Sequence, residues 1–302
     1  MTVSSQTTKR PGGEFLLGGR PVARVGFGVM QLAERHGRPP IAPDEAIRIL
    51  RHAVELGINH FDTAEFYGAG EANQLIRRAL APSTDDIVLV SKVGAAHAPG
   101  AEFPLVPAQK PAELRRDVEA NLASLGVEQL AVVNIRRADQ RPGILATGDQ
   151  VVDLDDQIAE MVALRDEGKI GAFGLSTVSL EQLEQALPAG VACVQNAYNL
   201  LERSDEPLLE VCRRAEIAWA PYFPLGSAFP GFPKVTDDPT VVDIATRLGV
   251  TPSQVGLAWI LQHSPNSLLI AGTSSLDHLA ENTAAGDILL DAEAMRALDA
   301  VA

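Results

Sequence analysis

The sequence predicts a single-domain (β/α)8 (TIM) barrel, and three observations lead to this fold class. Short apolar segments rich in β-formers alternate along the chain with longer segments that have helical periodicity. Eight of these β-like segments occur, each leading into a helical stretch, and eight parallel strands close a barrel. Neither G-x-G-x-x-G nor G-x-x-x-x-G-K-[ST] occurs, so the usual signatures of open nucleotide-binding sheets are absent.

The N-terminal part of the chain precedes the first predicted barrel strand. Residues 1–13 are predicted to be a flexible tail, and residues 14–302 to be the barrel domain. Within the domain, residues 15–24 are expected to form a short hairpin around Gly18 and Gly19 that closes the barrel bottom. The eight predicted strands then follow at residues 23–30, 58–64, 87–93, 131–137, 172–177, 191–198, 218–223 and 268–273.

The helices between the strands are predicted from their end signals. One begins at Pro43, where the fixed φ of proline suits the first turn, and ends near Gly57. Another begins at Pro111 and ends at Gly126. Two more are expected to begin at capping boxes, namely Ser179 with Gln182 and Thr251 with Gln254.

Composition excludes several function classes. The chain has 302 residues, a hydrophobic share of 46% and a net charge of −14, and no basic cluster that would favour nucleic acid. No signal peptide or membrane-spanning stretch is recognisable, so a cytoplasmic protein is expected. The two cysteines, Cys193 and Cys212, belong to no CxxC or Cys/His cluster, and no metal site is predicted.

Four polar residues at or after predicted strand ends are the candidates for chemistry: Asp62, Tyr67, Lys92 and Arg136. Active sites of such barrels form at the carboxyl ends of the strands. A buried lysine needs a neighbouring anion to stay charged, and Asp62 supplies one. The resulting ammonium is expected to lower the pKa of Tyr67, so that Tyr67 protonates a carbonyl oxygen while a cofactor delivers hydride to carbon.

At this point the chain resembles a known family. Residues 61–71, FDTAEFYGAGE, are similar to the signature loop of the aldo-keto reductases. The resemblance covers nearly the whole chain and includes residues 91–93 (SKV), 174–176 (GLS), 195–199 (QNAYN), 222–226 (YFPLG), 272–273 (GT) and 281–282 (EN). Together these motifs are specific, although any one of them alone is a weak signal.

The resemblance implies an NADPH-dependent carbonyl (aldehyde) reductase with Tyr67 as proton donor and Asp62 and Lys92 as its tuning pair. NADH remains the alternative cofactor. The implied nicotinamide site consists of Ser176, Gln195 and Tyr222. The implied sites for the pyrophosphate and the adenosine 2′-phosphate consist of Leu225, Ser227, Gly272, Thr273, His278 and Asn282.

Three positions depart from the family pattern. Arg136 occupies the place of the usual histidine, and an arginine donates hydrogen bonds but does not relay protons. Thr177 replaces an asparagine beside the nicotinamide site. Gly272 and His278 stand where the family commonly has a lysine and an arginine for the 2′-phosphate. The resemblance thus favours NADPH, while these residues weaken that preference.

A narrower resemblance, to the bacterial pyridoxal reductase branch, rests on five segments: residues 30–32 (MQL), 132–137 (VVNIRR), 223–226 (FPLG), 257–266 (LAWILQHSPN) and 271–275 (AGTSS). That branch reduces pyridoxal to pyridoxine with NADPH. Pyridoxal has an easily ionised ring hydroxyl next to its aldehyde, and Arg136 is a cation suited to bind both oxygens. Arg137, on the opposite face of the strand, is expected to be structural.

Two other functions are alternatives to carbonyl reduction. A cofactor-binding or redox-sensing module without turnover is the main alternative, and a phosphate-binding lyase or isomerase is a weaker one. Residues 94–107 are predicted to form a substrate loop and residues 226–239 a cofactor lid. The expected partner is a small-molecule carbonyl substrate, and the expected assembly is a monomer or a weak homo-oligomer.

Overall fold

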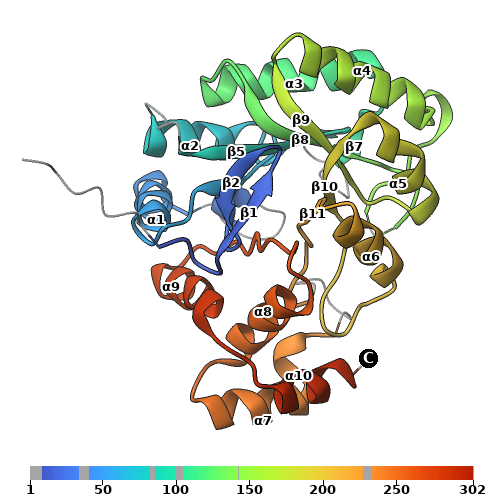
Figure 1. The fold of residues 1–302 in the computed structure, drawn as a ribbon. Helices are drawn as coiled ribbons and strands as arrows, with labels where there is room; N and C mark the ends of the chain where they lie inside the picture. Colours follow the sequence, from blue (N-terminus) through green and yellow to red (C-terminus); the bar gives the residue numbers. More distant parts are fainter. Residues whose placement is uncertain are drawn as a thin grey trace, which may run out of the picture.

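A computed structural model describes residues 9–33, 41–81, 86–98, 105–141, 143–226 and 233–301. Residues 1–8 of the predicted tail therefore lie outside the described residues. The central feature is a parallel sheet of seven strands, which curls on itself inside a ring of helices (Figure 1). In spatial order the strands are β3 (Phe27–Gly28), β4 (His60–Asp62), β5 (Val88–Val93), β8 (Leu130–Arg136), β9 (Ile170–Ser176), β10 (Val191–Gln195) and β11 (Ala218–Trp219).

The eighth predicted strand closes the barrel, although it does so with few backbone pairs. Ser267 forms a parallel bridge with Trp219, and Leu269 forms one with Val25. The Leu268 amide donates to the Trp219 carbonyl at 2.7 Å, and the Gly26 amide donates to the Leu269 carbonyl at 2.8 Å. The segment therefore joins the two edges of the seven-stranded sheet, and the fold is the predicted (β/α)8 barrel.

Several predicted strands are longer than the observed ones. The first ends at Gly28 because Val29–Leu32 forms a 3-10 helix, and the eighth has no regular ladder over residues 270–273. The segments 191–198 and 218–223 pair regularly only as far as Gln195 and Trp219. Beyond these points the chain continues as loops, so the apolar composition of these segments does not predict regular strand pairing there.

The predicted N-terminal hairpin is confirmed. Strands β1 (Glu14–Leu17) and β2 (Arg20–Ala23) pair antiparallel around Gly18 and Gly19, which have φ of +57° and +79°. Leu17 and Val22 are buried in one apolar cluster with Val132 and other side chains of the barrel strands. The hairpin thus closes the amino-terminal end of the barrel and leaves the other end for function.

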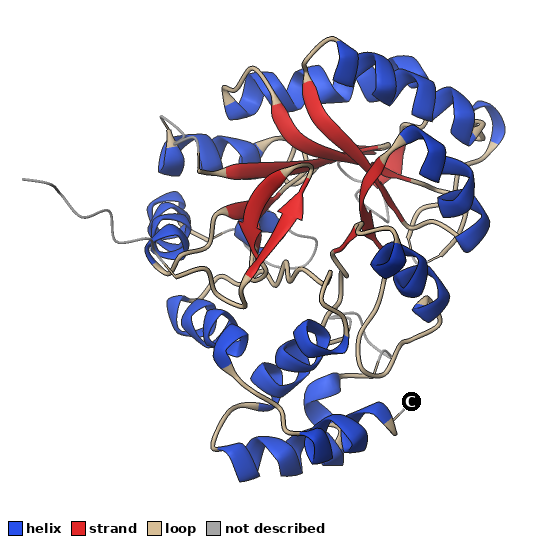
Figure 2. Ribbon diagram, in the orientation of Figure 1, coloured by secondary structure: helices blue, strands red, loops and turns tan. Residues whose placement is uncertain are grey.

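Ten α-helices occur among the described residues, and they surround the strands (Figure 2). They are α1 (Pro43–Glu55), α2 (Glu71–Leu80), α3 (Pro111–Leu125), α4 (Leu154–Asp166), α5 (Leu180–Ala186), α6 (Glu206–Arg214), α7 (Pro239–Leu248), α8 (Pro252–His263), α9 (Leu276–Ala284) and α10 (Ala292–Asp299). Short 3-10 helices lie at η1 (Val29–Leu32), η2 (Gly148–Gln150), η3 (Leu187–Ala189), η4 (Val235–Asp237) and η5 (Ala285–Asp287). Outside the barrel, β6 (Ala95–His97) and β7 (Leu105–Pro107) form an antiparallel pair.

The predicted helix ends agree with the structure. Helix α1 begins at Pro43 and α3 at Pro111, and Gly126 caps α3 in a left-handed conformation. Both capping boxes form: the Gln182 amide donates to Ser179 Oγ at 3.3 Å and the Gln254 amide to Thr251 Oγ1 at 3.2 Å. No helix in the described part of the chain is long and apolar enough to cross a bilayer.

Candidate active site

The carboxyl ends of neighbouring strands bring most of the predicted site residues to one rim of the barrel. Asp62 ends β4, Lys92 lies one residue before the end of β5, and Arg136 ends β8. Ser176 ends β9, opposite Arg136 in the strand register, and Gln195 ends β10, opposite Ser176. Because all five strands are parallel and adjacent, these side chains share the mouth of the barrel.

Asp62 and Lys92 form a buried ion pair at this rim. Their relative exposures are 3% and 7%, and the Lys92 ammonium donates directly to Asp62 Oδ1. Burial by itself lowers the pKa of Lys92, but attraction to Asp62 and Tyr67 outweighs burial and raises it. The other Asp62 oxygen accepts a hydrogen bond of 2.7 Å from Gln195 Nε2. The cation is therefore held charged and fixed in place.

Tyr67 follows β4 in the turn that leads to α2. The Lys92 Nζ atom lies 5.3 Å from the centroid of the Tyr67 ring, and the Phe66 ring packs edge-on against it at 5.2 Å. Ala69 and Gly70, with φ of +51° and +89°, make the tight turn that precedes α2. The predicted cluster of a phenol, an ammonium and a carboxylate is thus present at the rim.

The predicted direction of the Tyr67 pKa is wrong. Burial raises the pKa of Tyr67 above its usual value, and the nearby charges of Lys92 and Arg136 only partly offset this effect. The reason is the cost of burying a phenolate, which outweighs the attraction of the ammonium. The raised pKa keeps the Tyr67 phenol protonated over the working pH range, but it also makes the phenol a weaker acid.

Arg136 and Arg137 are consecutive residues, but their guanidinium groups have different partners. Burial lowers the pKa of Arg136, and its Nη1 atom is buried without a hydrogen-bond partner among the described residues. Among the described residues Arg136 has no ion pair, and a Cβ atom on Gly143 would lie 2.3 Å from its Nη2. Arg137 instead bonds to Asp139, Gln157 and the Val152 carbonyl, in agreement with its predicted structural role.

The predicted nicotinamide residues lie beside the ion pair. Ser176 is 3% exposed, and the Oε1 atom of Gln195 is buried without a partner in the described residues. The Tyr222 hydroxyl and Thr177 Oγ1 are 3.2 Å apart, and Thr177 has an unusual φ of +60°. The Gln195 Oε1 acceptor, which has no partner among the described residues, suits a ligand that carries an amide donor.

Most residues predicted for the far end of the cofactor lie between the end of the eighth strand segment and α9, and Leu225 lies earlier, after β11. Thr273 Oγ1 accepts from the Ser275 amide at 3.1 Å, and Ser275 Oγ accepts from the His278 amide at 3.4 Å, so both order the start of α9. Gly272 lies against Gly28, where a Cβ atom would be 2.4 Å from the Gly28 carbonyl oxygen. Asn282 lies in the last turns of the same helix, and Leu225 accepts from the Val235 amide through its carbonyl.

Some predictions fall where the structure gives no description. Ser227 lies outside the described residues, as do residues 99–104 of the predicted substrate loop and 227–232 of the predicted lid. The described parts of the substrate loop form the β6–β7 pair. The roles of these two loops stay predictions.

A polar network behind the rim was not predicted from the sequence. The Thr63 carbonyl accepts from Lys92 Nζ at 3.3 Å, and the Thr63 hydroxyl donates to Asn73 Oδ1 at 2.7 Å. Asn73 Nδ2 in turn donates to Glu65 Oε2 at 2.7 Å. The network holds the loop that contains Tyr67 against α2. The available signal was Asn73, which follows the signature loop and lies ten and eight residues after Thr63 and Glu65.

Comparison with known proteins shows which family has a similar sequence. Residues 24–302 match the sequence model of the Aldo/keto reductase family. Pyridoxine 4-dehydrogenase of Escherichia coli (strain K12) is 40% identical to the chain over 95% of the chain and 97% of the relative. An uncharacterized oxidoreductase of Schizosaccharomyces pombe is 34% identical over 98% of the chain and 92% of the relative.

Solved structures agree with the fold. An aldo/keto reductase from Klebsiella pneumoniae, crystallised with NADP and acetate, superposes with a TM-score of 0.77 at 26% identity, over 96% of this chain and 94% of that one. The thermostable aldo-keto reductase Tm1743, in complex with the inhibitor epalrestat, gives a TM-score of 0.78 at 26% identity, over 96% and 99% of the two chains.

Proposed function

The chain belongs to the aldo/keto reductase family, and on that premise we propose that it reduces aldehydes with NADPH and that pyridoxal, which would become pyridoxine, is one of its substrates. The observation that carries the proposal is the buried pair of Asp62 and Lys92 beside Tyr67 at the barrel mouth. The 40% identity of the chain to pyridoxine 4-dehydrogenase supports pyridoxal as the proposed substrate.

NADPH is the proposed cofactor, and when bound it supplies the hydride. Solved relatives from Klebsiella pneumoniae contain NADP and NADPH. In this chain Ser176 and Gln195 would bind the nicotinamide carboxamide, with Tyr222 against the ring. The unpaired Gln195 Oε1 suits an amide N–H. Toward the other end of the cofactor, the proposed contacts are Leu225, Ser227, Gly272, Thr273, His278 and Asn282.

Tyr67 is the proposed proton donor. In the reduction, hydride adds to the carbonyl carbon, the C=O π electrons move to oxygen, and the Tyr67 hydroxyl transfers its proton to that oxygen. Lys92 stabilises the phenolate that forms, because its ammonium lies near the ring and stays charged beside Asp62. Solvent then returns a proton to Tyr67, and the products are the alcohol and oxidised cofactor.

Arg136 is proposed to bind the substrate oxygens. Its Nη1 is buried without a partner among the described residues, and a buried N–H donor that lacks an acceptor is unfavourable. Pyridoxal offers an ionised ring oxygen next to its aldehyde, so one guanidinium can donate to both. Arg136 thus takes over the electrophilic assistance of the family histidine without relaying a proton.

Loss of nicotinamide absorbance tests the proposal directly. Pyridoxal and 4-nitrobenzaldehyde are each incubated with the enzyme and either NADPH or NADH. We expect turnover with NADPH, and we expect Tyr67→Phe to lower kcat by roughly 10²–10⁴-fold while NADPH binding changes little. Tyr198→Phe, which removes another tyrosine hydroxyl at a distant bond to Glu206, is the matched control and should keep its turnover.

Two results would contradict the proposal. Undiminished turnover by Tyr67→Phe would remove Tyr67 from its role. NADPH binding without reduction of any aldehyde would instead support the alternative of a binding or redox-sensing module.

A further inference from the structure

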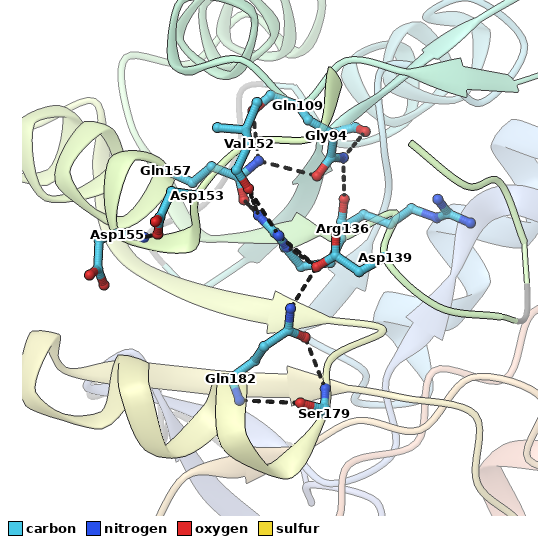
Figure 3. A network of polar contacts seen from close by, with 11 residues as sticks. Gly94, Gln109, Arg136, Asp139, Val152, Asp153, Asp155, Gln157, Ser179 and Gln182 are labelled. Atoms are coloured by element: carbon cyan, nitrogen blue, oxygen red, sulfur yellow. Dashed lines mark hydrogen bonds and ion pairs between the residues drawn. The ribbon is translucent and has the colours of Figure 1, made fainter. Parts of the chain in front are cut away.

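Gln109 lies between β7 and α3 and is almost fully buried, with 1% of its surface exposed. Its side-chain amide donates to two backbone carbonyls, those of Gly94 and Arg136, the second at 2.8 Å. Gly94 follows the end of β5, and Arg136 is the last residue of β8. One amide group therefore bridges the carboxyl ends of the two strands that contain Lys92 and Arg136 (Figure 3).

This bridge begins where the sheet pairing stops. The register between β5 and β8 runs from Val90 opposite Val132 to Val93 opposite Ile135. One residue further along each strand, the Gln109 amide joins the two chains in place of a backbone pair. The strand ends are thus held together at the level of the active-site rim.

Gln109 is itself fixed from the opposite side. Gln157 Nε2 donates to the Gln109 carbonyl at 2.6 Å and to Gln109 Oε1 at 3.1 Å. Gln157 Oε1 accepts from Arg137 at 2.5 Å, and Gln150 Oε1 accepts from the backbone amide of Gln109 at 2.6 Å. Both N–H groups and the oxygen of the Gln109 side chain are used, so the side chain has one favourable orientation.

The bridge also sets the base of the β6–β7 hairpin. Gly94 has φ of +100°, and a Cβ atom there would lie 2.4 Å from the Arg136 carbonyl oxygen and 3.0 Å from Gln109 Nε2. The Ala108 amide also donates to the Gly94 carbonyl, at 3.2 Å. From this base, Ala95 and Leu105 of the hairpin extend into an apolar cluster with Phe66 and Tyr67. Gln109 therefore connects the two strand ends to the base of the β6–β7 hairpin, and the hairpin in turn packs against Tyr67.

We propose that Gln109 is a positioning residue for the substrate side of the site: it holds the Arg136 strand end and the hairpin that packs against Tyr67. The kinetic part of this inference rests on the proposed aldehyde reductase function. The predicted cofactor residues lie on β9, β10 and later segments, which Gln109 does not contact through any hydrogen bond within the described residues. Loss of Gln109 should therefore affect the aldehyde more than NADPH.

Gln109→Met is the test variant, because methionine keeps the unbranched shape but removes both donors. We expect the KM for pyridoxal to rise about tenfold, which is the scale of one unsatisfied buried carbonyl, while kcat and the NADPH Kd change less than about threefold. Gln182→Met is the matched control. It removes an amide at the far end of the same network, where it donates to Asp139 at 2.6 Å, and should leave KM unchanged.

Hydrogen exchange gives a readout that does not depend on turnover. In Gln109→Met, the amides of Ala108, of residues 95–97 and of residues 105–107 should exchange faster than in the wild type, whereas those of α2 should not. If the wild type reduces no aldehyde, the proposed function fails, and exchange at the hairpin still decides the role of Gln109.

The proposal is overturned if folded Gln109→Met has wild-type KM and wild-type hairpin exchange. It is also overturned if KM and the NADPH Kd rise by the same factor, which would indicate a general loss of structure. Should Gln109→Met fail to fold, Gln109→Glu, which keeps the shape and the acceptor for Gln157, is measured against the same outcomes.

Discussion

Arg136 and Arg137 end the same stretch of chain, yet the regions around their guanidinium groups differ. On the outer side of the barrel Arg137 is surrounded by acceptors: Asp139, Gln157 and the Val152 carbonyl. At the mouth Arg136 lies near Tyr67 and Tyr222, and its buried Nη1 has no partner within the part of the chain that the structure describes. The alternation of side chains along a strand sends consecutive residues to opposite faces, so Arg137 is part of the packing and Arg136 lies at the barrel mouth.

The contrast between Arg136 and Arg137 distinguishes a cation that stabilises the fold from one whose donors are available to a ligand. A buried cation whose donors are all satisfied offsets its desolvation within the protein. The half-buried Arg136, whose buried Nη1 has no acceptor among the described residues, can instead donate to a ligand. Arg136 therefore marks the place where an anionic or strongly polar substrate oxygen is expected, whereas Arg137 marks a joint between β8, α4 and α5.

Replacing Arg137 should have the largest effect on stability. Arg137→Met leaves Gln157 Oε1 and the Val152 carbonyl without their donor, and we expect the free energy of unfolding to fall by about 2–4 kcal/mol. Urea denaturation followed by circular dichroism measures it. Arg136→Met is the matched control and should unfold with nearly the wild-type free energy, because the buried Nη1 of Arg136 has no hydrogen bond to lose among the described residues. Equal losses for both variants would erase the contrast.

Replacing Arg136 should have the largest effect on selectivity. In Arg136→His we expect kcat/KM for pyridoxal to fall about tenfold further than kcat/KM for 4-nitrobenzaldehyde, because only pyridoxal has the ionised oxygen next to its aldehyde. Steady-state kinetics with both aldehydes measure the difference. Equal losses for the two substrates would count against a substrate-specific role of Arg136.

The smallest expected effect is on pH dependence. Oxidation of the alcohol requires Tyr67 to accept a proton, so its rate should rise with pH toward the Tyr67 pKa, which burial raises and the Arg136 charge lowers. Arg136→Met removes that positive charge, so the Tyr67 pKa should rise further and the rising limb should move to higher pH, by less than about one pH unit. The limb is measured from pyridoxine oxidation with NADP⁺ between about pH 7 and 10.5.

The variant Arg137→Met serves as control, because Arg137 does not contribute to the pKa of Tyr67. Its limb should coincide with that of the wild type. A limb that moves to lower pH in Arg136→Met would contradict the electrostatic coupling between Arg136 and Tyr67.

Much of the fold could be predicted, since its signals are local. Pro43 and Pro111 begin helices because proline fits the first turn, and Ser179 with Gln182 forms its cap within four residues of chain. The extent of the eighth strand is harder to predict from the sequence. Its apolar composition is that of a strand, but only single bridges at Ser267 and Leu269 join it to its neighbours.

The candidate site shows the same division between near and distant contacts. The position of Asp62, Lys92 and Arg136 at strand ends follows from counting along the chain, because parallel strands bring equivalent ends to one rim. The role of Gln109 does not, since it depends on bonds to Gly94 and Arg136, which lie 15 and 27 residues away.

The barrel, its closed bottom and the residue types at its mouth can be predicted from local patterns, because periodicity, turn residues and caps act over a few residues. The balance of the charges at the mouth depends on how distant elements pack together. Among the described residues Arg136 Nη1 has no partner whereas Arg137 is paired, and burial raises the pKa of Tyr67. The physical reason is desolvation: how much water a group loses depends on all the elements that pack around it, and no local pattern contains that sum.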